Sequence, residues 1–522
     1  MNEIYHSKVM NRLVLTPALF VAFIMPQPGS AQKMKLNKSR SPNIIFILAD
    51  DLGYGDLGCY GQKRIETPNI DKLAATGMRF TQHYSGAPVC APSRCVLLTG
   101  KHMGHAFIRG NDEWAERGKV WDYRAMIADS TLEGQRPLPE NEITFPQLLK
   151  TAGYINGMVG KWGLGAPNTN STPMHKGFDF FFGYNCQRQA HTYYPVHLYK
   201  NDHRDYLTND TVAPDTKLEK GADPFNLNSY LKYTLKKYAP DLMFKELTGF
   251  VKANKDNPFF MYWATPIPHA PIQAPQRWVE YYVKKFGDEK PYQGEMGYFP
   301  HRYPHAGYAA MISYLDEQVG LLVQQLKDLG IYENTLIIFT SDNGPTYNGG
   351  TDSPWFNSGG PFKSEFGWGK GFTHEGGFRV PMIASWPGKI KRGSVSNHIS
   401  AFWDVLPTMC ELTGIKIPVP ADGISFLPEL KGKKQKTHEY LYWEFPESGG
   451  EQAVRMNKWK AIRQNIKKGN LKIQLFNLDT DLLELTDVST LYPEIVKQME
   501  KIMFKEHVPA TQEIFKMKAL GD

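Results

Sequence analysis

Side chains that carry oxygen follow two apolar runs of this sequence. Asp50 and Asp51 come directly after the run NIIFILA. Asp342 and Asn343 come one residue after the run TLIIFT. Carboxylate and amide oxygens are the ligands that hard divalent cations prefer, and adjacent buried carboxylates repel each other unless a cation is their partner. These four residues therefore predict a metal site, in which Ca²⁺ is favoured over Mg²⁺ because it accepts an amide oxygen and irregular geometry.

A lysine and a histidine follow two further apolar runs. Lys161 comes shortly after INGMV, and His269 comes shortly after FFMYWAT. Taken one at a time, a polar residue at a strand end is explained just as well as part of a turn or a helix cap. In an open α/β sheet, however, ligands bind outside the carboxyl ends of the strands. Four strands that each end in an acid, a lysine or a histidine therefore predict one shared ligand site.

A cysteine stands where a loop is expected to become a helix, in the stretch SGAPVCAPSRCVLLTGKH. Pro92 suits the first turn of a helix because its missing N–H is not needed there. Cys90 is therefore expected at a helix N-terminus, where free N–H groups and the helix dipole favour negative charge. From these residues alone, Cys90 is either a buried structural cysteine or a reactive thiolate.

The elements that must position these side chains form two different patterns. Over residues 42–435, apolar runs of strand length alternate with longer helical patterns, which predicts an α/β fold with a large, mixed, mostly parallel sheet sandwiched by helices. Over residues 436–522, short strand-like segments (YLYWEF, AVRMNKWKAIRQ, KIQLFNL) precede a helical pattern, which predicts a smaller C-terminal α+β domain with an antiparallel sheet. Residues 187–247 are polar, aromatic and weakly periodic, and we expect an insertion there that lines a pocket.

The first residues have the pattern of an export signal. Lys8 and Arg12 precede an apolar run, and Gly29 and Ala31 are spaced for cleavage. The apolar run is short for a membrane span. We therefore expect residues 1–31 to be a signal peptide, and the mature protein to be periplasmic or secreted without a stable membrane anchor.

Charge and cysteine content argue against a nucleic-acid partner, a disulfide framework and a thiolate zinc site. The formal charge of +7 is small for 522 residues, and the basic residues are scattered, so no nucleic-acid partner is expected. The five cysteines are odd in number, irregularly spaced and without a CxxC pair. A disulfide framework and a thiolate zinc site are therefore not expected.

Seven motifs together resemble those of the formylglycine-dependent sulfatases, the type I sulfatases of the alkaline phosphatase superfamily. In chain order they are DDLGYGD (50–56), CAPSR (90–94), LLTG (97–100), GKW (160–162), SDNG (341–344), GKG (369–371) and EGGFRVP (375–381). A CxPSR motif alone is weak evidence, whereas this set is specific. The resemblance runs from about residue 42 to the C-terminus. It implies an alkaline-phosphatase-like fold and a sulfuric-ester hydrolase.

The resemblance also implies how Cys90 acts. A formylglycine-generating or sulfatase-maturating enzyme would oxidise Cys90 to formylglycine, and the hydrate of that aldehyde would be the nucleophile. The four oxygen-bearing residues named above would hold Ca²⁺ together with the modified Cys90. Arg94 would orient the hydrate.

Three further residues would act on the sulfate ester itself. By the same resemblance, Lys161 and Lys370 would neutralise the sulfate oxygens. His269 would donate a proton to the departing alcohol oxygen, which a sulfate ester needs because its leaving group is otherwise poor.

One position departs from the family pattern. Many members have a histidine two residues after the lysine, in Gly-Lys-Trp-His, where it assists elimination from the aldehyde hydrate; here that position is Gly163. His191 is the candidate replacement or substrate contact. His102, His105 and His374 are rival candidates.

The substrate class is indicated by analogy. GKWGLG together with GYNCQRQAHTYYP resembles bacterial carbohydrate sulfatases, some of which act on sulfated galactose or N-acetylgalactosamine. Arg109 and Asn111, with residues 187–247 and the C-terminal domain, would then bind the sulfated saccharide. Two alternatives stay open: a phosphate or phosphonate monoester hydrolase of the same superfamily, and an inactive protein that binds sulfated glycans.

Overall fold

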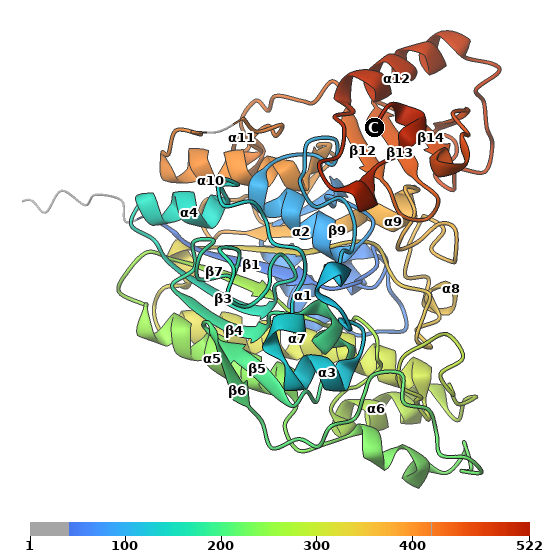
Figure 1. Ribbon diagram of the computed structural model, residues 1–522. Helices are drawn as coiled ribbons and strands as arrows, with labels where there is room; N and C mark the ends of the chain where they lie inside the picture. Colours follow the sequence, from blue (N-terminus) through green and yellow to red (C-terminus); the bar gives the residue numbers. More distant parts are fainter. Residues whose placement is uncertain (1–40, 419) are drawn as a thin grey trace, which may run out of the picture. The chain divides into compact units, whose positions relative to one another are not determined.

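The large sheet has the first apolar run at its centre (Figure 1). The computed structural model describes residues 41–418 and 420–522, so the predicted signal peptide lies outside the described residues. The strand order is β10-β2-β9-β8-β1-β7-β3-β4-β5-β6, and β11 also pairs with β2. The strands are β1 (Asn43–Ala49), β2 (Met78–Tyr84), β3 (Ile155–Lys161), β4 (Phe180–Tyr184), β5 (His197–Lys200), β6 (His203–Tyr206), β7 (Phe259–Ala264), β8 (Thr335–Ser341), β9 (Arg379–Ser385), β10 (Ser394–Ser396) and β11 (Ser400–Ala401).

The centre of the sheet is parallel, as predicted. β1 pairs in parallel with both β7 and β8, and β7 pairs in parallel with β3. Ala49 of β1 lies opposite Ser341 of β8, and Leu48 lies opposite Ala264 of β7. The residues that follow these strands therefore emerge at one edge of the sheet. β9, β5 and β6 are antiparallel to their neighbours, so the sheet is mixed.

Helices cover both faces of the sheet. β1 is buried along its whole length: Ile45 and Ile47 pack into a core with α1, α5, α6 and α7, whereas Phe46 and Leu48 pack into a core with α2, α4 and α10. The helices are α1 (Pro68–Thr76), α2 (Cys90–Thr99), α3 (Tyr123–Ala128), α4 (Phe145–Thr151), α5 (Ala239–Ala253), α6 (Gln276–Phe286), α7 (Pro304–Asp328), α8 (Ser353–Phe356), α9 (Glu375–Phe378), α10 (Val405–Thr413), α11 (Leu427–Leu430) and α12 (Pro493–Glu506). No helix of the described residues has both the length and the apolar character to span a membrane.

The longest helix begins earlier than its periodicity suggests. The apolar spacing predicts a helix over residues 313–329, whereas α7 begins at Pro304, a residue that suits the first helical turn. Its first three turns are rich in alanine and almost entirely buried, so they lack the polar face that reveals an amphipathic helix.

The C-terminal region forms the expected second sheet. β12 (Leu441–Phe445), β13 (Glu451–Met456), β14 (Trp459–Gln464) and β15 (Ile473–Asn477) pair in that order, all antiparallel. α12 packs on this sheet through Met499 and Met503. The segment AVRMNKWKAIRQ divides into two strands at Asn457, whose positive φ of 52° makes the turn. The domain boundary expected between residues 435 and 436 stays a prediction.

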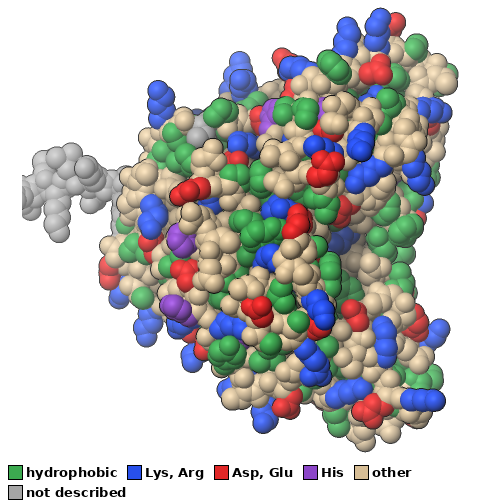
Figure 2. Space-filling model, viewed as in Figure 1, with side chains coloured by type: hydrophobic (Ala, Val, Ile, Leu, Met, Phe, Trp, Pro, Cys, Tyr) green, Lys and Arg blue, Asp and Glu red, His purple; other side chains and the backbone are tan. Residues whose placement is uncertain are grey.

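Residues 187–247 are more regular than expected. β5 and β6 extend the large sheet at its end, and α5 begins inside this stretch at Ala239. The strands are only four residues long and β6 is largely exposed, which explains their weak signal in the sequence. On the face shown in Figure 2, basic and acidic side chains are interspersed.

Candidate active site

Three carboxylates and an amide meet where β1 and β8 end. Asp50 and Asp51 follow β1, Asp342 and Asn343 follow β8, and all four side chains are buried. The backbone N–H of Asp51 donates to Oδ1 of Asp342 at 3.2 Å, and Nδ2 of Asn343 donates to Oδ1 of Asp51 at 2.8 Å. Asp51 has a positive φ of 64°, which turns the chain at the edge of the sheet.

Three cationic side chains face these carboxylates. Nζ of Lys161, the last residue of β3, lies 2.7 Å from Oδ2 of Asp50. Nζ of Lys370 lies 2.8 Å from Asp51. From α2, Arg94 donates to Oδ2 of Asp342 through Nη2 at 2.8 Å and through Nε at 3.1 Å. We call these six side chains the carboxylate cluster: Asp50, Asp51, Asp342, Lys161, Lys370 and Arg94.

Burial and neighbouring charges shift the pKa values of Asp50 and Asp342 in opposite directions. Burial raises the pKa of Asp50, but the charges of Lys161, His269 and Arg94 outweigh it, so the pKa lies below its usual range. Burial, followed by the charge on Asp50, raises the pKa of Asp342. The charges of Asp50 and Asp51 therefore oppose the ionisation of Asp342, an effect that a bound cation would relieve.

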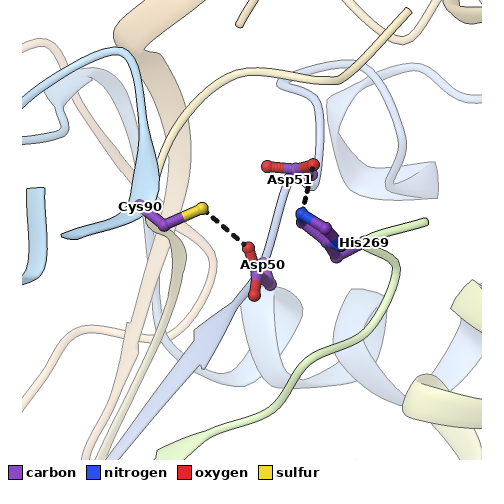
Figure 3. Close-up of side chains that lie close together, drawn as sticks. All are labelled: Asp50, Asp51, Cys90 and His269. Carbon is purple, nitrogen blue, oxygen red and sulfur yellow. Dashed lines mark hydrogen bonds and ion pairs between the residues drawn. The ribbon is translucent and has the colours of Figure 1, made fainter. Parts of the chain in front are cut away.

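Cys90 is the first residue of α2 and points into this group (Figure 3). Its Sγ donates to Oδ1 of Asp50 at 3.4 Å. Burial, followed by the negative charge of Asp50, raises the pKa of the thiol. The reactive-thiolate interpretation is therefore disfavoured, because these effects exceed what the helix N-terminus contributes.

His269 lies on the other side of the carboxylates (Figure 3). It follows β7, and its Nε2 is 3.7 Å from Oδ2 of Asp51. Its Nδ1 donates to the carbonyl oxygen of Ala270, which leaves Nε2 facing the cluster. Burial, with the charges of Lys370 and Lys161, lowers the pKa of His269 well below its usual value. One ligand atom from each of Asp50, Asp51, Cys90 and His269 lies within 4.8 Å of the others.

The donor set fits a hard cation. The carboxylate cluster offers oxygen atoms, and Oδ1 of Asn343 is a further one. Within residues 41–418 and 420–522, nothing donates a hydrogen bond to that buried Oδ1. An oxygen without a partner beside three carboxylates is a costly arrangement that a bound cation stabilises.

Comparisons with known proteins give the family. Residues 42–415 match the family model described as Sulfatase, and residues 364–508 match the model for the C-terminal part of N-sulphoglucosamine sulphohydrolase. The chain belongs to the sulfatase family. It is 34% identical to arylsulfatase A of Homo sapiens over 448 residues, which cover 81% of this chain and 75% of the relative. It is 32% identical to N-acetylgalactosamine-6-sulfatase of Canis lupus familiaris over 460 residues, which cover 86% of this chain and 74% of the relative.

A solved structure shares the fold of this chain. The sulfatase superposes on Ps i-CgsB, solved in complex with k-i-k-neocarrahexaose, with a TM-score of 0.69 and 28% identity, covering 90% of this chain and 94% of that chain. The alkaline-phosphatase-like fold and the sulfuric-ester hydrolase class expected from the sequence are thereby confirmed.

The sulfatase has a glutamine where a histidine side chain would need space. A Cβ at Gly163 would lie 2.8 Å from Cγ of Gln187, and Gly163 has a positive φ of 77°. The side chain of Gln187 therefore occupies this space. Its Oε1 is buried and accepts no hydrogen bond from the described residues. No pattern in the sequence singles out Gln187, although it lies in the same CQRQAH stretch as His191.

His191 lies next to His269. The two rings are stacked with centroids 5.5 Å apart, and Tyr298 meets both rings edge-on. His191 is partly exposed, and no hydrogen bond links its ring to the described residues. It is therefore free to contact a substrate. Tyr298 was missed because no spacing pattern connects it with the strand ends.

The rival histidines have other partners. His102 pairs with Glu506 at 3.1 Å and His105 pairs with Asp422 at 3.0 Å. The ring of His374 lies 4.1 Å from that of Trp368. None of the three belongs to the group around Asp50 within the described residues.

The two predicted saccharide contacts lie in different settings. Arg109 is buried and donates to the carbonyl oxygens of Ala106, Gly104 and Val508 and to Glu444. These bonds join the catalytic part to the C-terminal part, so a substrate role for Arg109 does not fit its contacts. Asn111 lies beside the nucleophile position, because its Oδ1 accepts from the N–H of Ala91 at 3.1 Å.

Proposed function

We propose that this sulfatase hydrolyses a carbohydrate sulfate ester of the galactose or N-acetylgalactosamine type, with a formylglycine derived from Cys90 and a bound Ca²⁺. The observation that carries the proposal is the position of Cys90, with Sγ 3.4 Å from Asp50 inside a buried group of carboxylates and cations. A thiol with a raised pKa is a poor nucleophile as it stands. The same position suits a side chain that is oxidised by a maturating enzyme before it acts.

Asp50, Asp51, Asp342, Asn343 and the oxidised Cys90 would hold the metal. The support is the all-oxygen donor set, together with the unpartnered Oδ1 of Asn343. When bound, Ca²⁺ withdraws electron density from the oxygens it contacts, and formylglycine supplies a hydroxyl nucleophile through its hydrate. The remaining chemistry belongs to the residues around them.

The basic residues bind and orient the anion. The charges of Lys161 and Lys370 act on Cys90, where both lower the pKa of the thiol against the effect of burial. Fixed ammonium groups beside the nucleophile position stabilise the oxygens of a sulfate group, where charge rearranges as the ester bond breaks. Arg94 is held by Asp342 and by the carbonyl oxygen of Lys161, so it positions the start of α2.

His269 is the proton donor to the departing alcohol oxygen. Its Nδ1 donates to the carbonyl oxygen of Ala270, so the proton for the alcohol must be on Nε2, the nitrogen that faces the cluster, and the ring must be protonated. Burial and the charges of Lys370 and Lys161 oppose that state, whereas the negative charge of a bound sulfate ester favours it. The site is buried, which limits water around the leaving group. His191, stacked on His269, is the candidate contact to the substrate and to the elimination step that Gly163 leaves without a histidine.

The saccharide class is supported by the relatives. One relative is named for N-acetylgalactosamine-6-sulfate chemistry, and Ps i-CgsB was solved with a neocarrahexaose. Parallel assays of 4-nitrophenyl sulfate and 4-nitrophenyl phosphate, after co-expression with a maturating enzyme, test the reaction class. We expect turnover of the sulfate ester; preference for the phosphate ester would favour the phosphomonoesterase alternative.

Mass spectrometry of the Cys90 peptide separates enzyme from glycan binder. We expect the aldehyde or its hydrate; a peptide that stays a thiol despite the maturating enzyme, with no turnover, would favour the inactive binder. A panel of monosulfated galactose and N-acetylgalactosamine then identifies the sulfated position.

Export is the remaining proposal. The support is the N-terminal pattern of a basic segment, an apolar run and small residues before Gln32. N-terminal sequencing of the mature protein from the periplasm or medium is expected to begin near Gln32; an intact N-terminus in the cytoplasm would contradict export.

A further inference from the structure

A glutamate from the C-terminal region lies beside the residues that surround the nucleophile. Glu447 follows β12, and its Oε1 accepts a hydrogen bond from the backbone N–H of Asn111. Asn111 in turn accepts from Ala91, which directly follows Cys90. Through one residue, Glu447 is thus connected to the start of α2.

The same loop also contacts the segment that carries Lys370. Oγ of Ser448 donates to the carbonyl oxygen of Gly371 at 2.8 Å. Gly371 donates to the carbonyl oxygen of Pro88 at 2.9 Å. Glu447 is therefore held between two active-site segments, one next to Cys90 and one next to Lys370.

The chain leaves room for this carboxyl group. A Cβ at position 110 would lie 2.5 Å from Oε1 of Glu447, so Gly110 permits its close approach. Glu447 is partly exposed, and within residues 41–418 and 420–522 no hydrogen bond or ion pair reaches its Oε2. One oxygen is fixed by the protein, and the other is free to accept a hydrogen bond.

The charged neighbours of Glu447 differ from those of the aspartates in the carboxylate cluster. Burial raises its pKa to about 7 against the charges of Lys467 and Lys370, neither of which forms an ion pair with it. Asp50 and Asp51, by contrast, each have an ammonium group within 2.8 Å. Above pH 7, where Glu447 is ionised, a second negative group would meet a carboxylate without an ion-pair partner among the described residues.

We propose that Glu447 is a specificity-determining residue: its free Oε2 accepts a hydrogen bond from a hydroxyl of the sulfated sugar, and it excludes sugars with a second anionic group at that position. The inference rests on the proposed carbohydrate sulfatase function. A hydroxyl donates readily to a carboxylate, whereas a sulfate or uronate group is repelled by it and has no proton to donate.

The variant Glu447→Gln tests this inference. The amide oxygen still accepts from Asn111, while the free acceptor becomes a donor and the charge is removed. The control Glu439→Gln makes the same change at an exposed glutamate of the same region. The probes are a monosulfated N-acetylgalactosamine or galactose, the disulfated form of the same sugar, and 4-nitrophenyl sulfate.

We expect Glu447→Gln to lower kcat/KM for the monosulfated sugar about 10- to 100-fold, the range of one hydrogen bond to a charged group. The loss on 4-nitrophenyl sulfate is expected to be much smaller, and the ratio of disulfated to monosulfated turnover is expected to rise. Glu439→Gln is expected to change none of these values. Equal losses on sugar and aryl sulfates, or an unchanged ratio, would show that Glu447 only holds its loop and would overturn the inference.

Calorimetric titration with the monosulfated sugar distinguishes the two levels of proposal. If wild type turned over no sulfate ester, the proposed function would fail. The titration uses Cys90→Ala and Cys90→Ala/Glu447→Gln, which cannot turn the sugar over, and the inference about Glu447 would fail separately if these two variants bound it equally.

Discussion

The carboxylate cluster resembles a second buried group of charges in composition but not in the state of its hydrogen bonds. We call this second group the linking cluster, because it joins the large sheet to the C-terminal sheet; it consists of Tyr84, Glu375, Arg379, Arg455, Lys460 and Glu484. Both carboxylate oxygens of Glu375 are bonded: Oε2 accepts from Tyr84 at 2.7 Å and from Arg379 at 3.0 Å, and Oε1 accepts from Lys460 at 3.0 Å.

The linking cluster is fully paired. Burial raises the pKa of Glu375, but Lys460, Arg455 and Arg379 outweigh it, so its pKa is lowered. The active site instead leaves Oδ1 of Asn343 and Oε1 of Gln187 without partners within the described residues. Buried polar groups that are all satisfied stabilise one structure, whereas unsatisfied ones are available to water, an ion or a substrate.

The largest effect on turnover is expected for Cys90→Ala in the active site. Turnover is expected to fall by about 10⁵-fold or more, because the precursor of the nucleophile is gone. The free energy of unfolding should change little, because Sγ makes one long contact with an already paired carboxylate. Kinetics on 4-nitrophenyl sulfate and urea denaturation measure the two quantities. Loss of folding would return Cys90 to a structural role.

The opposite outcome is expected for Lys460→Met in the linking cluster. Removing one partner from a buried network leaves Glu375 and Glu484 undercompensated, and we expect about 3–5 kcal/mol loss of unfolding free energy. Lys458→Met, at an exposed lysine two residues earlier, is the control. Urea denaturation measures both. Equal stability of the two variants would remove the distinction between the clusters.

His269→Ala tests whether His269 donates a proton to the leaving group. We expect kcat/KM for a sugar sulfate to fall by about 10²- to 10³-fold, the usual contribution of a general acid. An activated aryl sulfate should lose far less, because its leaving group needs little protonation. Steady-state kinetics on both esters decide; losses of the same size would argue against a proton donor.

Ca²⁺ is expected to stabilise the protein by binding at the carboxylate cluster and not at the linking cluster. At a free concentration 100 times the dissociation constant, bound Ca²⁺ should raise the unfolding free energy by about 2.7 kcal/mol. Asn343→Leu should lose most of this gain, whereas Lys460→Met should keep it. Thermal denaturation with Ca²⁺ and with a chelator measures the change. A gain that survives Asn343→Leu would place the ion elsewhere.

The smallest effect is expected at a partly exposed charged group. His305 lies 2.9 Å from both Glu289 and Asp352, and these partners raise its pKa to about 9 although burial lowers it. Because the folded pKa exceeds the unfolded value, the stabilisation is present below pH 6.5 and is lost as the pH rises through 9. With solvent screening we expect about 1 kcal/mol.

His305→Gln should remove this loss between pH 6.5 and 9, measured by urea denaturation across the range. His203→Gln, at an exposed histidine, is the control and should behave like wild type. A pH profile that is the same in His305→Gln and wild type would contradict the assignment.

Much of the site could be predicted because strand ends are local signals. The four central apolar runs became β1, β3, β7 and β8 within two residues of their expected ends, and the acids, lysine and histidine after them meet at one edge. Lys370 lies in a loop and only its motif indicated it, whereas Asn111 was named only by analogy with carbohydrate sulfatases. The contacts of Arg109 could not be predicted, because a sequence does not show whether a guanidinium faces a substrate or the protein's own acceptors.

The sheet, the ligand types at its edge and the family could all be predicted before folding was considered, because periodicity and motif spacing are encoded over short stretches. Which charges are paired is visible only in the folded chain. The contacts of Gln187 with the space at Gly163, of Glu447 with Asn111 and of Lys460 with Glu375 join residues 24, 336 and 85 positions apart. Such pairings depend on how segments distant in the sequence pack together, which no local pattern contains.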